Sequence, residues 1–133
     1  MDAVLDRWLT REQARFDAEL AGRTSERDRM LAHIRITSEL TREERTSVAA
    51  LMVALVSAGE AETSSTRWYR ARAGTLEATT EEARRLRIAF LAAEGANYLR
   101  DLFGFAVSDE LWRQIFGDLR KYAEGSSATQ ENG

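Results

Sequence analysis

Apolar residues recur along the chain at helical spacing, in six segments separated by short polar or glycine-containing stretches. Residues at i, i+3, i+4 and i+7 share one face of an α-helix, so this recurrence predicts amphipathic helices. We expect helices over residues 2–21, 24–40, 41–59, 61–76, 79–103 and 108–124. No segment alternates as a strand would, and no internal repeat occurs. The pattern therefore predicts an all-α fold, a single helical-bundle domain.

Helix-start signals stand at four of these boundaries. A Ser or Thr side chain can accept a hydrogen bond from a free N–H of the first turn, and a Glu three residues later can complete a capping box. Val107 can also pack on Trp112 as a hydrophobic staple. The predicted N-terminal residues are Thr24 or Ser25, Thr41 with Glu44, Thr79 with Glu82, and Ser108.

The stretch RRLRIAFLAAEGANYLRDLFGF, residues 84–105, departs from simple amphipathicity. Apolar residues occupy nearly the whole circumference from Ile88 to Ala93, and Glu94 and Gly95 follow. A helix that is apolar all round is either central to its own domain or shared with a partner. Glycine destabilises a helix by ~1 kcal/mol relative to alanine. Close approach of another helix would explain Gly95.

The composition indicates which class of protein the chain belongs to. The 133 residues fit one domain, which we place at residues 1–124, and residues 125–133 are expected to be a disordered tail without core-forming residues. Hydrophobic residues make up 44% and charged residues 31%, as in globular chains. No apolar run approaches the ~20 residues of a membrane span. The lack of cysteine excludes disulfides and thiolate metal sites and fits a cytoplasmic location.

The charge pattern argues against a DNA-binding surface on this chain. The formal net charge is −3, whereas a domain that binds DNA by itself normally presents a basic face. The arginines, Arg67, Arg70 and Arg72 among them, are interpreted as interleaved with acids along the helices. We interpret them as solvated helix faces.

Catalytic patterns are also missing from the sequence. It contains no glycine-rich phosphate loop and no nucleophile elbow. The single histidine and the lack of cysteine argue against a zinc site. The carboxylate pairs Glu43/Glu44 and Glu81/Glu82 stand at helix starts, where they complement the helix dipole. We therefore predict no enzyme activity, no catalytic residue, no metal site and no cofactor.

Residues 84–105, followed after a short connector by SDELWRQIFGDLRKYAEG (108–125), resemble the C-terminal ligand-binding and dimerisation domain of TetR/AcrR-like transcriptional regulators. The resemblance rests on the step Ala93-Glu94-Gly95 and on the corner Leu102-Phe103-Gly104. The segment AVLDRWLTREQARFDAELAG (3–22) looks like the helix that joins the DNA-reading module to the sensor in that family. The family's N-terminal helix-turn-helix has no counterpart in this sequence, so DNA contact is expected only through a helix-turn-helix not present in this chain. The chain is either a fragment of a longer regulator or a protein that kept only the sensor.

The resemblance implies a homodimer in which the last two helices of each subunit form a four-helix interface. Helical spacing groups small and apolar residues on one face of each of these helices. A monomeric bundle in which the same residues are ordinary core stays an alternative. The predicted interface residues are Ala92, Gly95, Leu99, Leu102, Leu111, Ile115 and Leu119.

The resemblance also implies a cavity between the helices for a small apolar or amphipathic effector. Sites for small molecules are mostly apolar with a few converging polar groups. Glu94 has an equally weighted structural role if it pairs with a neighbour on its own helix, such as Arg87 or Asn97. His33 has an alternative role as a packing residue. The predicted pocket residues are Trp8, His33, Thr37, Met52, Trp68, Glu94, Asn97 and Tyr98.

Two functions follow from these observations. The first is a ligand-sensing and dimerisation domain of a TetR-like regulator. The second is a stand-alone helical adaptor that binds a protein partner through its apolar helix pair and takes no ligand. The coding sequence upstream of Met1 distinguishes them, since an in-frame helix-turn-helix there favours the regulator.

Overall fold

A computed structural model of the chain describes residues 2–58 and 64–125, with the side chains of residues 7–50, 53 and 66–125. It contains the helices α1 (Asp2–Leu20), α2 (Glu26–Glu39), α3 (Arg42–Ala58), α4 (Ser64–Ala73), α5 (Glu81–Asp101) and α6 (Asp109–Glu124). The described residues form no strand, so the predicted all-α bundle is confirmed. Within this part of the chain, none of the helices has the length and apolarity needed to cross a bilayer.

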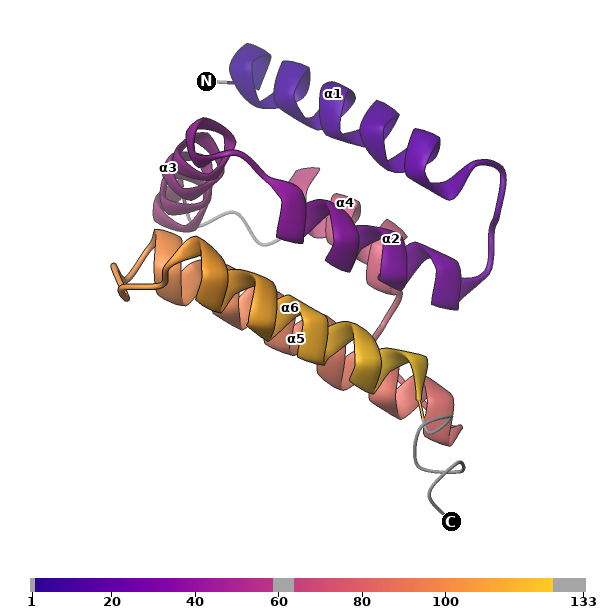
Figure 1. The fold of residues 1–133 in the computed structure, drawn as a ribbon. Helices are drawn as coiled ribbons and strands as arrows, with labels where there is room; N and C mark the ends of the chain where they lie inside the picture. Colours follow the sequence, from indigo (N-terminus) through magenta and orange to yellow (C-terminus); the bar gives the residue numbers. More distant parts are fainter. Residues whose placement is uncertain (1, 59–63, 126–133) are drawn as a thin grey trace.

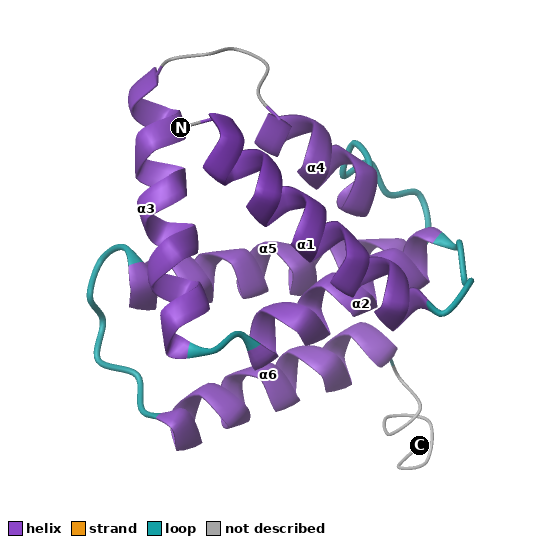
Figure 2. Ribbon diagram, turned by 90° about the horizontal axis from the view of Figure 1, so that it is seen from above, coloured by secondary structure: helices purple, strands orange, loops and turns teal. Residues whose placement is uncertain are grey.

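The helix α2 is the centre of the bundle. It packs against α1, α4, α5 and α6, while α5 pairs with α6 along most of its length (Figure 1). Seen from above, α3 runs across the ends of the other helices and contacts α5 (Figure 2). The helix α1 therefore lies on the side of α2 that faces away from the α5–α6 pair, and α4 lies behind α2 in this view, where Tyr69 contacts α5 (Figure 1).

The main hydrophobic core lies between α2, α5 and α6. Trp112 and Phe116 point inward from α6, with 6% and 2% of their surface exposed, as the helix periodicity predicts. Ile34 from α2 is fully buried, and Phe90 from α5 is 5% exposed. Two smaller clusters surround Trp8 with Val48 and Phe16 with Ala32 and Ile36, and they attach α1 to the bundle.

Three of the predicted N-terminal caps are confirmed. The Ser25 hydroxyl accepts from the Asp28 amide at 3.0 Å, and Ser108 accepts from the Leu111 amide at 3.1 Å. Thr41 and Glu44 form the reciprocal capping box: the Thr41 amide donates to Glu44 Oε1 at 2.9 Å, and the Glu44 amide donates to Thr41 Oγ1 at 3.2 Å. These caps depend only on local sequence, which is why the pattern predicts them.

The other predicted boundaries need correction. Thr79 is not the cap of α5; Thr80 is, because its side chain accepts from the Ala83 amide at 3.0 Å. α4 ends at Ala73 and not at residue 76, since Gly74 (φ +65°) and Leu76 (φ +67°) adopt left-handed backbone conformations that break the helix. α5 ends two residues before its predicted end at 103. Residues 59–63 and the predicted tail from 126 onward lie outside the described residues.

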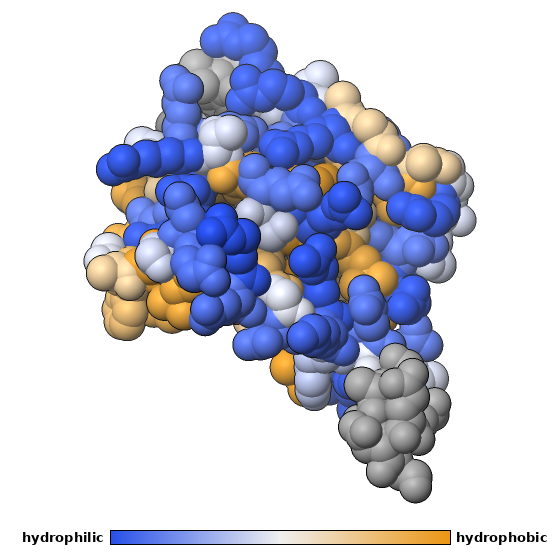
Figure 3. Space-filling view, in the orientation of Figure 1, coloured by the Kyte–Doolittle hydropathy of each residue, from blue (hydrophilic) through white to orange (hydrophobic). Residues whose placement is uncertain are grey.

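The outward faces of α5 and α6 carry exposed apolar side chains. Ile88, Leu91 and Leu99 on α5 are 49%, 50% and 45% exposed, and Leu111 on α6 is 41% exposed. The connector between the two helices adds Phe103 and Phe105. Figure 3 shows hydrophobic side chains gathered at the left-hand end of the α5–α6 pair, on a surface that is otherwise mostly hydrophilic.

The contrast between buried and exposed aromatic residues predicts a difference in stability. Phe116→Ala removes a buried ring and leaves a cavity, so we expect it to lower the free energy of unfolding by about 3–5 kcal/mol. Phe105→Ala, the control at a 59% exposed position, should change it by no more than about 0.5 kcal/mol. Urea denaturation followed by circular dichroism measures both. Equal losses for the two variants would contradict this assignment of the core.

Candidate functional site

A cluster of polar and charged side chains is buried where α1, α2, α4 and α5 meet. Arg72 is 1% exposed, His33 is 3% exposed, and Glu94 is 9% exposed. A buried charge without a partner costs several kcal/mol. The contacts of these groups therefore decide how the four helices fit together.

Glu94 receives hydrogen bonds from two other helices. Its Oε1 contacts Nε2 of His33 on α2, and its Oε2 accepts from the hydroxyl of Tyr69 on α4 at 2.7 Å. The Tyr69 proton is used in that bond, so the hydroxyl of Tyr98, 3.0 Å away, donates to the Tyr69 oxygen. The partners of Glu94 come from other helices and not from Arg87 or Asn97 on its own helix.

Arg72 joins this cluster to α1. Its Nη2 donates to the backbone carbonyl of Glu12 at 3.2 Å. Its guanidinium lies 4.1 Å from the ring centre of Phe16 and 3.6 Å from that of Trp68, within the range of cation–π attraction. The α4 side chain therefore binds both the backbone and an aromatic ring of α1.

The arginine also fixes the tautomer of His33. Nη1 of Arg72 lies 3.3 Å from Nδ1 of His33, and a guanidinium can only donate. Nδ1 must then be the acceptor, so the imidazole proton is on Nε2, where it is donated to Glu94. The Thr37 hydroxyl, which donates to the His33 carbonyl at 2.8 Å, packs beside the same ring.

The electrostatics of the cluster keep Glu94 ionised. Burial alone would raise the pKa of Glu94, but the hydrogen bonds from His33 and Tyr69 and the charge of Arg72 together lower it. Burial raises the pKa of Tyr69, and the charge of Glu94 adds to that shift. Burial lowers the pKa of Arg72 to about 10, which still leaves it charged at neutral pH. Two groups of opposite charge, Arg72 and Glu94, thus contact the two ring nitrogens of His33.

A small internal cavity of about 30 Å³ lies against this cluster. Such a volume holds about one or two water molecules. Seven buried side-chain nitrogen and oxygen atoms among the described residues have no hydrogen-bond partner. Four of them belong to residues that line this cavity: Trp8 Nε1, Trp68 Nε1, Arg72 Nε and Asn97 Oδ1. Native proteins satisfy most buried polar groups. These residues therefore offer hydrogen-bonding groups beside the cavity that no other part of the described protein uses.

An open groove of about 570 Å³ lies on the other side of Tyr69 and Glu94. It runs between α4, the α4–α5 connector and α5, and Leu76, Phe90 and Tyr98 contribute to its walls. Tyr69 and Glu94 line both the groove and the internal cavity. Their hydrogen bond therefore separates the cavity from the groove.

Six of the predicted pocket residues come together at the internal cavity, and a seventh, Tyr98, lines the groove and contacts Tyr69. The side chain of Met52 is not among the described side chains. Contact of these residues with a ligand stays a prediction. The six are Trp8, His33, Thr37, Trp68, Glu94 and Asn97.

Sequence reasoning missed Arg72, Tyr69 and Glu12 as members of the cluster. The interpretation of Arg72 as part of a solvated face is wrong, since its side chain is buried between aromatic rings. An arginine in a short polar helix looks the same in sequence whether it faces solvent or the core. The neighbouring Trp68 and Tyr69 were the one available signal that this helix has a buried side.

Three of the seven predicted dimer residues are exposed, and the other four, Leu102 among them, are half-buried. Ala92, Leu99 and Leu111 are exposed, whereas Ile115 and Leu119 are half-buried against the chain's own core. A Cβ atom at Gly95 would meet no atom within 4 Å. No part of the chain that the structure describes therefore approaches Gly95 closely, and the glycine is not explained by packing within the subunit.

The pKa of Glu94 leads to a prediction about acid stability. Because this pKa is lowered from 4.5 in the folded protein, the carboxylate stabilises the fold above pH 4.5, and the stabilisation is lost as the pH falls further. Glu94→Gln should lower the free energy of unfolding at neutral pH by about 1–3 kcal/mol and make its fall in acid shallower. Urea denaturation at a series of pH values measures both effects.

Glu77→Gln is the matched control, because Glu77 is exposed and its substitution makes the same charge change. It should leave the stability and its pH dependence close to those of the wild type. If Glu94→Gln and the wild type lose stability in parallel as the pH falls, the carboxylate is not held ionised by the cluster.

Comparison with known proteins agrees with this architecture. A family model described as tetracyclin repressor-like, C-terminal domain, matches residues 27–124, which include α3 to α6 and nearly all of α2. Neither the curated proteins nor the solved structures contain a match to the chain. Residues 1–26, with α1, lie outside the matched segment. The matched segment covers most of the chain, and the protein therefore belongs to the family of tetracycline repressor-like C-terminal domains, which are regulatory modules.

Proposed function

We propose that this chain is the ligand-sensing and dimerisation domain of a TetR-like transcriptional regulator and not an enzyme. The effector binds at the internal cavity between α1, α2, α4 and α5. The observation that carries this proposal is that four residues lining this one cavity each hold a buried polar atom without a partner, three donors and one amide oxygen. Buried polar groups without partners are costly unless water or a ligand satisfies them. DNA is contacted through a separate helix-turn-helix module, and we assign none of the described residues to it.

The size of the cavity implies that it must widen before an effector binds. Ligand sites usually enclose about 300–1,000 Å³, and the present cavity encloses about 30 Å³. The groove beside it is large enough for a small molecule. Separation of Tyr69 from Glu94 would join the two spaces, so the effector enters from the groove through this pair.

The chemistry of the walls narrows the class of effector. Three of the unpartnered atoms are N–H donors, on Trp8, Trp68 and Arg72, so the effector must bring acceptor oxygens. Aromatic rings form much of the wall, which suits a planar apolar body. The effector is therefore a small amphipathic molecule, a planar ring system with a carbonyl, carboxylate or hydroxyl oxygen.

Arg72 couples the cavity to α1. It lines the cavity and at the same time holds the Glu12 carbonyl and the Phe16 ring of α1. An effector oxygen that accepts from Nε of Arg72 draws the guanidinium towards the effector and so changes its contact with α1, which Nη2 makes. The effector must bind one position of α1 better than the other, and this difference in affinity sets the size of the response.

The homodimer forms through the outward faces of α5 and α6. Their exposed leucine and isoleucine side chains and the open space at Gly95 suit a second copy of the same helix pair. The same apolar surface is the one observation that favours the adaptor alternative. An adaptor would use this surface for a different protein and would leave the cavity without a ligand.

The effector class is testable with paired probes. We expect 1-naphthol and 1-naphthoate to raise the melting temperature more than naphthalene, since only the first two offer an oxygen to the indole and guanidinium donors. A ligand at one hundred times its dissociation constant stabilises the fold by about 2.7 kcal/mol. Differential scanning calorimetry measures the shift. Trp68→Phe, which keeps a ring but removes a donor, should weaken binding of the oxygen-bearing probes by about tenfold.

Tyr122→Phe is the control for this experiment, because Tyr122 is 45% exposed and lies outside both the cavity and the groove. It should leave every shift unchanged. Equal shifts of the melting temperature for all three probes would contradict the proposal that the cavity requires an acceptor oxygen. Equal losses of affinity in Trp68→Phe and Tyr122→Phe would contradict it as well.

The dimer surface predicts a change of mass in solution. The wild type should sediment at twice the chain mass of 15.0 kDa. Leu99→Arg places a charge in the apolar interface and should give the monomer at micromolar concentration. Val53→Arg, the control at an exposed position on α3, should remain dimeric. A wild type that sediments as a monomer independently of concentration would rule the interface out.

A further inference from the structure

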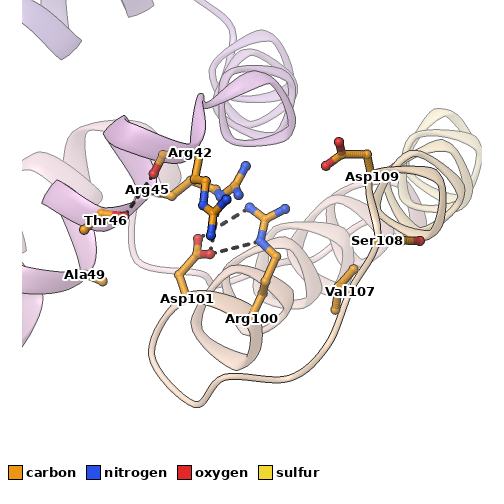
Figure 4. Close-up of a pocket in the computed structure, with 9 residues that line it drawn as sticks. All are labelled: Arg42, Arg45, Thr46, Ala49, Arg100, Asp101, Val107, Ser108 and Asp109. Carbon is orange, nitrogen blue, oxygen red and sulfur yellow. Dashed lines mark hydrogen bonds and ion pairs between the residues drawn. The ribbon is translucent and has the colours of Figure 1, made fainter.

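A second pocket lies at the end of the bundle where the start of α3, the end of α5 and the start of α6 meet. It encloses about 700 Å³ and shares no lining residue with the internal cavity or the groove. Three arginines line it: Arg42 and Arg45 from α3, and Arg100 from α5. Figure 4 shows the side chains of Arg42 and Arg45 extending from α3 towards Arg100 and Asp101.

Arg100 is held in place on both sides. Its Nε and Nη2 donate to the two carboxylate oxygens of Asp101, at 3.0 and 3.4 Å. Its guanidinium lies 3.3 Å from the ring centre of Trp112, and the side chain is only 8% exposed. Two of its five N–H groups are used by Asp101, so three are left for another acceptor. The guanidinium is thus oriented before any ligand binds.

Arg45 and Arg42 leave donors without acceptors. Arg45 Nε lies 3.4 Å from Asp101 Oδ1, close enough for charge attraction, but the orientation gives no hydrogen bond, and this buried atom has no other partner. Arg42 is exposed, and within the described residues its guanidinium has no ion-pair or hydrogen-bond partner. One carboxylate, Asp101, is therefore shared by two arginines, and a third arginine stands beside them unpaired.

The charge balance favours an anion. Asp101 and Asp109 are the carboxylates in the lining, so three positive charges face two negative ones. Burial lowers the pKa of Arg100, Asp101 opposes this shift, and the positive charge of Arg45 adds to it. An anion between the guanidiniums would relieve their mutual repulsion. The first turn of α6, capped by Ser108, adds the positive end of a 16-residue helix.

We propose that this pocket binds a small organic anion through Arg42, Arg45 and Arg100. Guanidinium groups match the planar paired oxygens of carboxylates and phosphates, so the ligand carries at least one such group. The pocket volume admits a molecule of metabolite size. This site is separate from the proposed effector cavity, and it joins α3 to the α5–α6 pair that carries the proposed dimer face.

Isothermal titration calorimetry tests the site with two probes, inorganic phosphate and succinate, at constant ionic strength in a buffer free of both groups. We expect at least one probe to bind with a dissociation constant at or below about 1 mM, and the tighter one identifies the preferred group. Arg42→Ala should weaken binding at least about tenfold. The melting temperature measured in the absence of anion should not change, because Arg42 is exposed and unpaired. Arg42→Lys, which keeps the charge but not the paired donors, should bind with intermediate affinity.

Arg113→Ala is the matched control, since Arg113 is an exposed arginine on α6 that pairs with Glu110 outside the pocket. It should bind both probes as the wild type does. The proposal is overturned if neither probe binds, or if Arg113→Ala weakens binding as much as Arg42→Ala, because the effect would then be general charge screening. It is also overturned if Arg42→Ala binds with wild-type affinity.

Discussion

The burial of Arg72 is the constraint on which the arrangement of α1, α2 and α4 depends. A guanidinium can be placed in the interior only if acceptors and ring faces replace the water it loses. Here the acceptors are Nδ1 of His33 and the Glu12 carbonyl, and the rings are those of Phe16 and Trp68. Each of these groups comes from a fixed position on its helix. The short helix α4, which has few apolar anchors of its own, is thereby held in one orientation against α1 and α2.

The two faces of the helix α5 lie in different environments. Successive helical residues are separated by about 100°, so Glu94 faces the polar cluster while Gly95 faces outward. The unusual apolarity of this helix follows from that arrangement, since one face packs on α2 and α6 and the other presents isoleucine and leucine to the surface. The carboxylate is compatible with this environment because its two oxygens are both hydrogen-bonded by groups from other helices.

Local signals in the sequence predicted the helices and most of their N-terminal caps. Ser25, Thr41 and Ser108 were predicted because a cap needs only neighbours within one turn. The error at Thr79 arises from the adjacent Thr80, which offers the same side chain one residue later. Contacts between distant residues were out of reach: His33 and Glu94 are 61 positions apart, and only the packing of α2 on α5 brings them together. Trp68 lies one turn before Arg72 on α4, but the burial of Arg72 also depends on Phe16 of α1 and His33 of α2, which no periodicity within α4 predicts.

His33 is the only histidine in the chain, and it lies at the centre of the polar cluster with one ring nitrogen towards Arg72 and the other towards Glu94. An imidazole in which one nitrogen carries the proton and the other accepts gives two well-separated nitrogen resonances in NMR. With a single histidine these resonances need no assignment. Displacement of Arg72 changes the first resonance, and displacement of Glu94 changes the second. The domain therefore contains its own spectroscopic reporter, which distinguishes a molecule that acts on the α1 side of the cluster from one that acts on the α5 side.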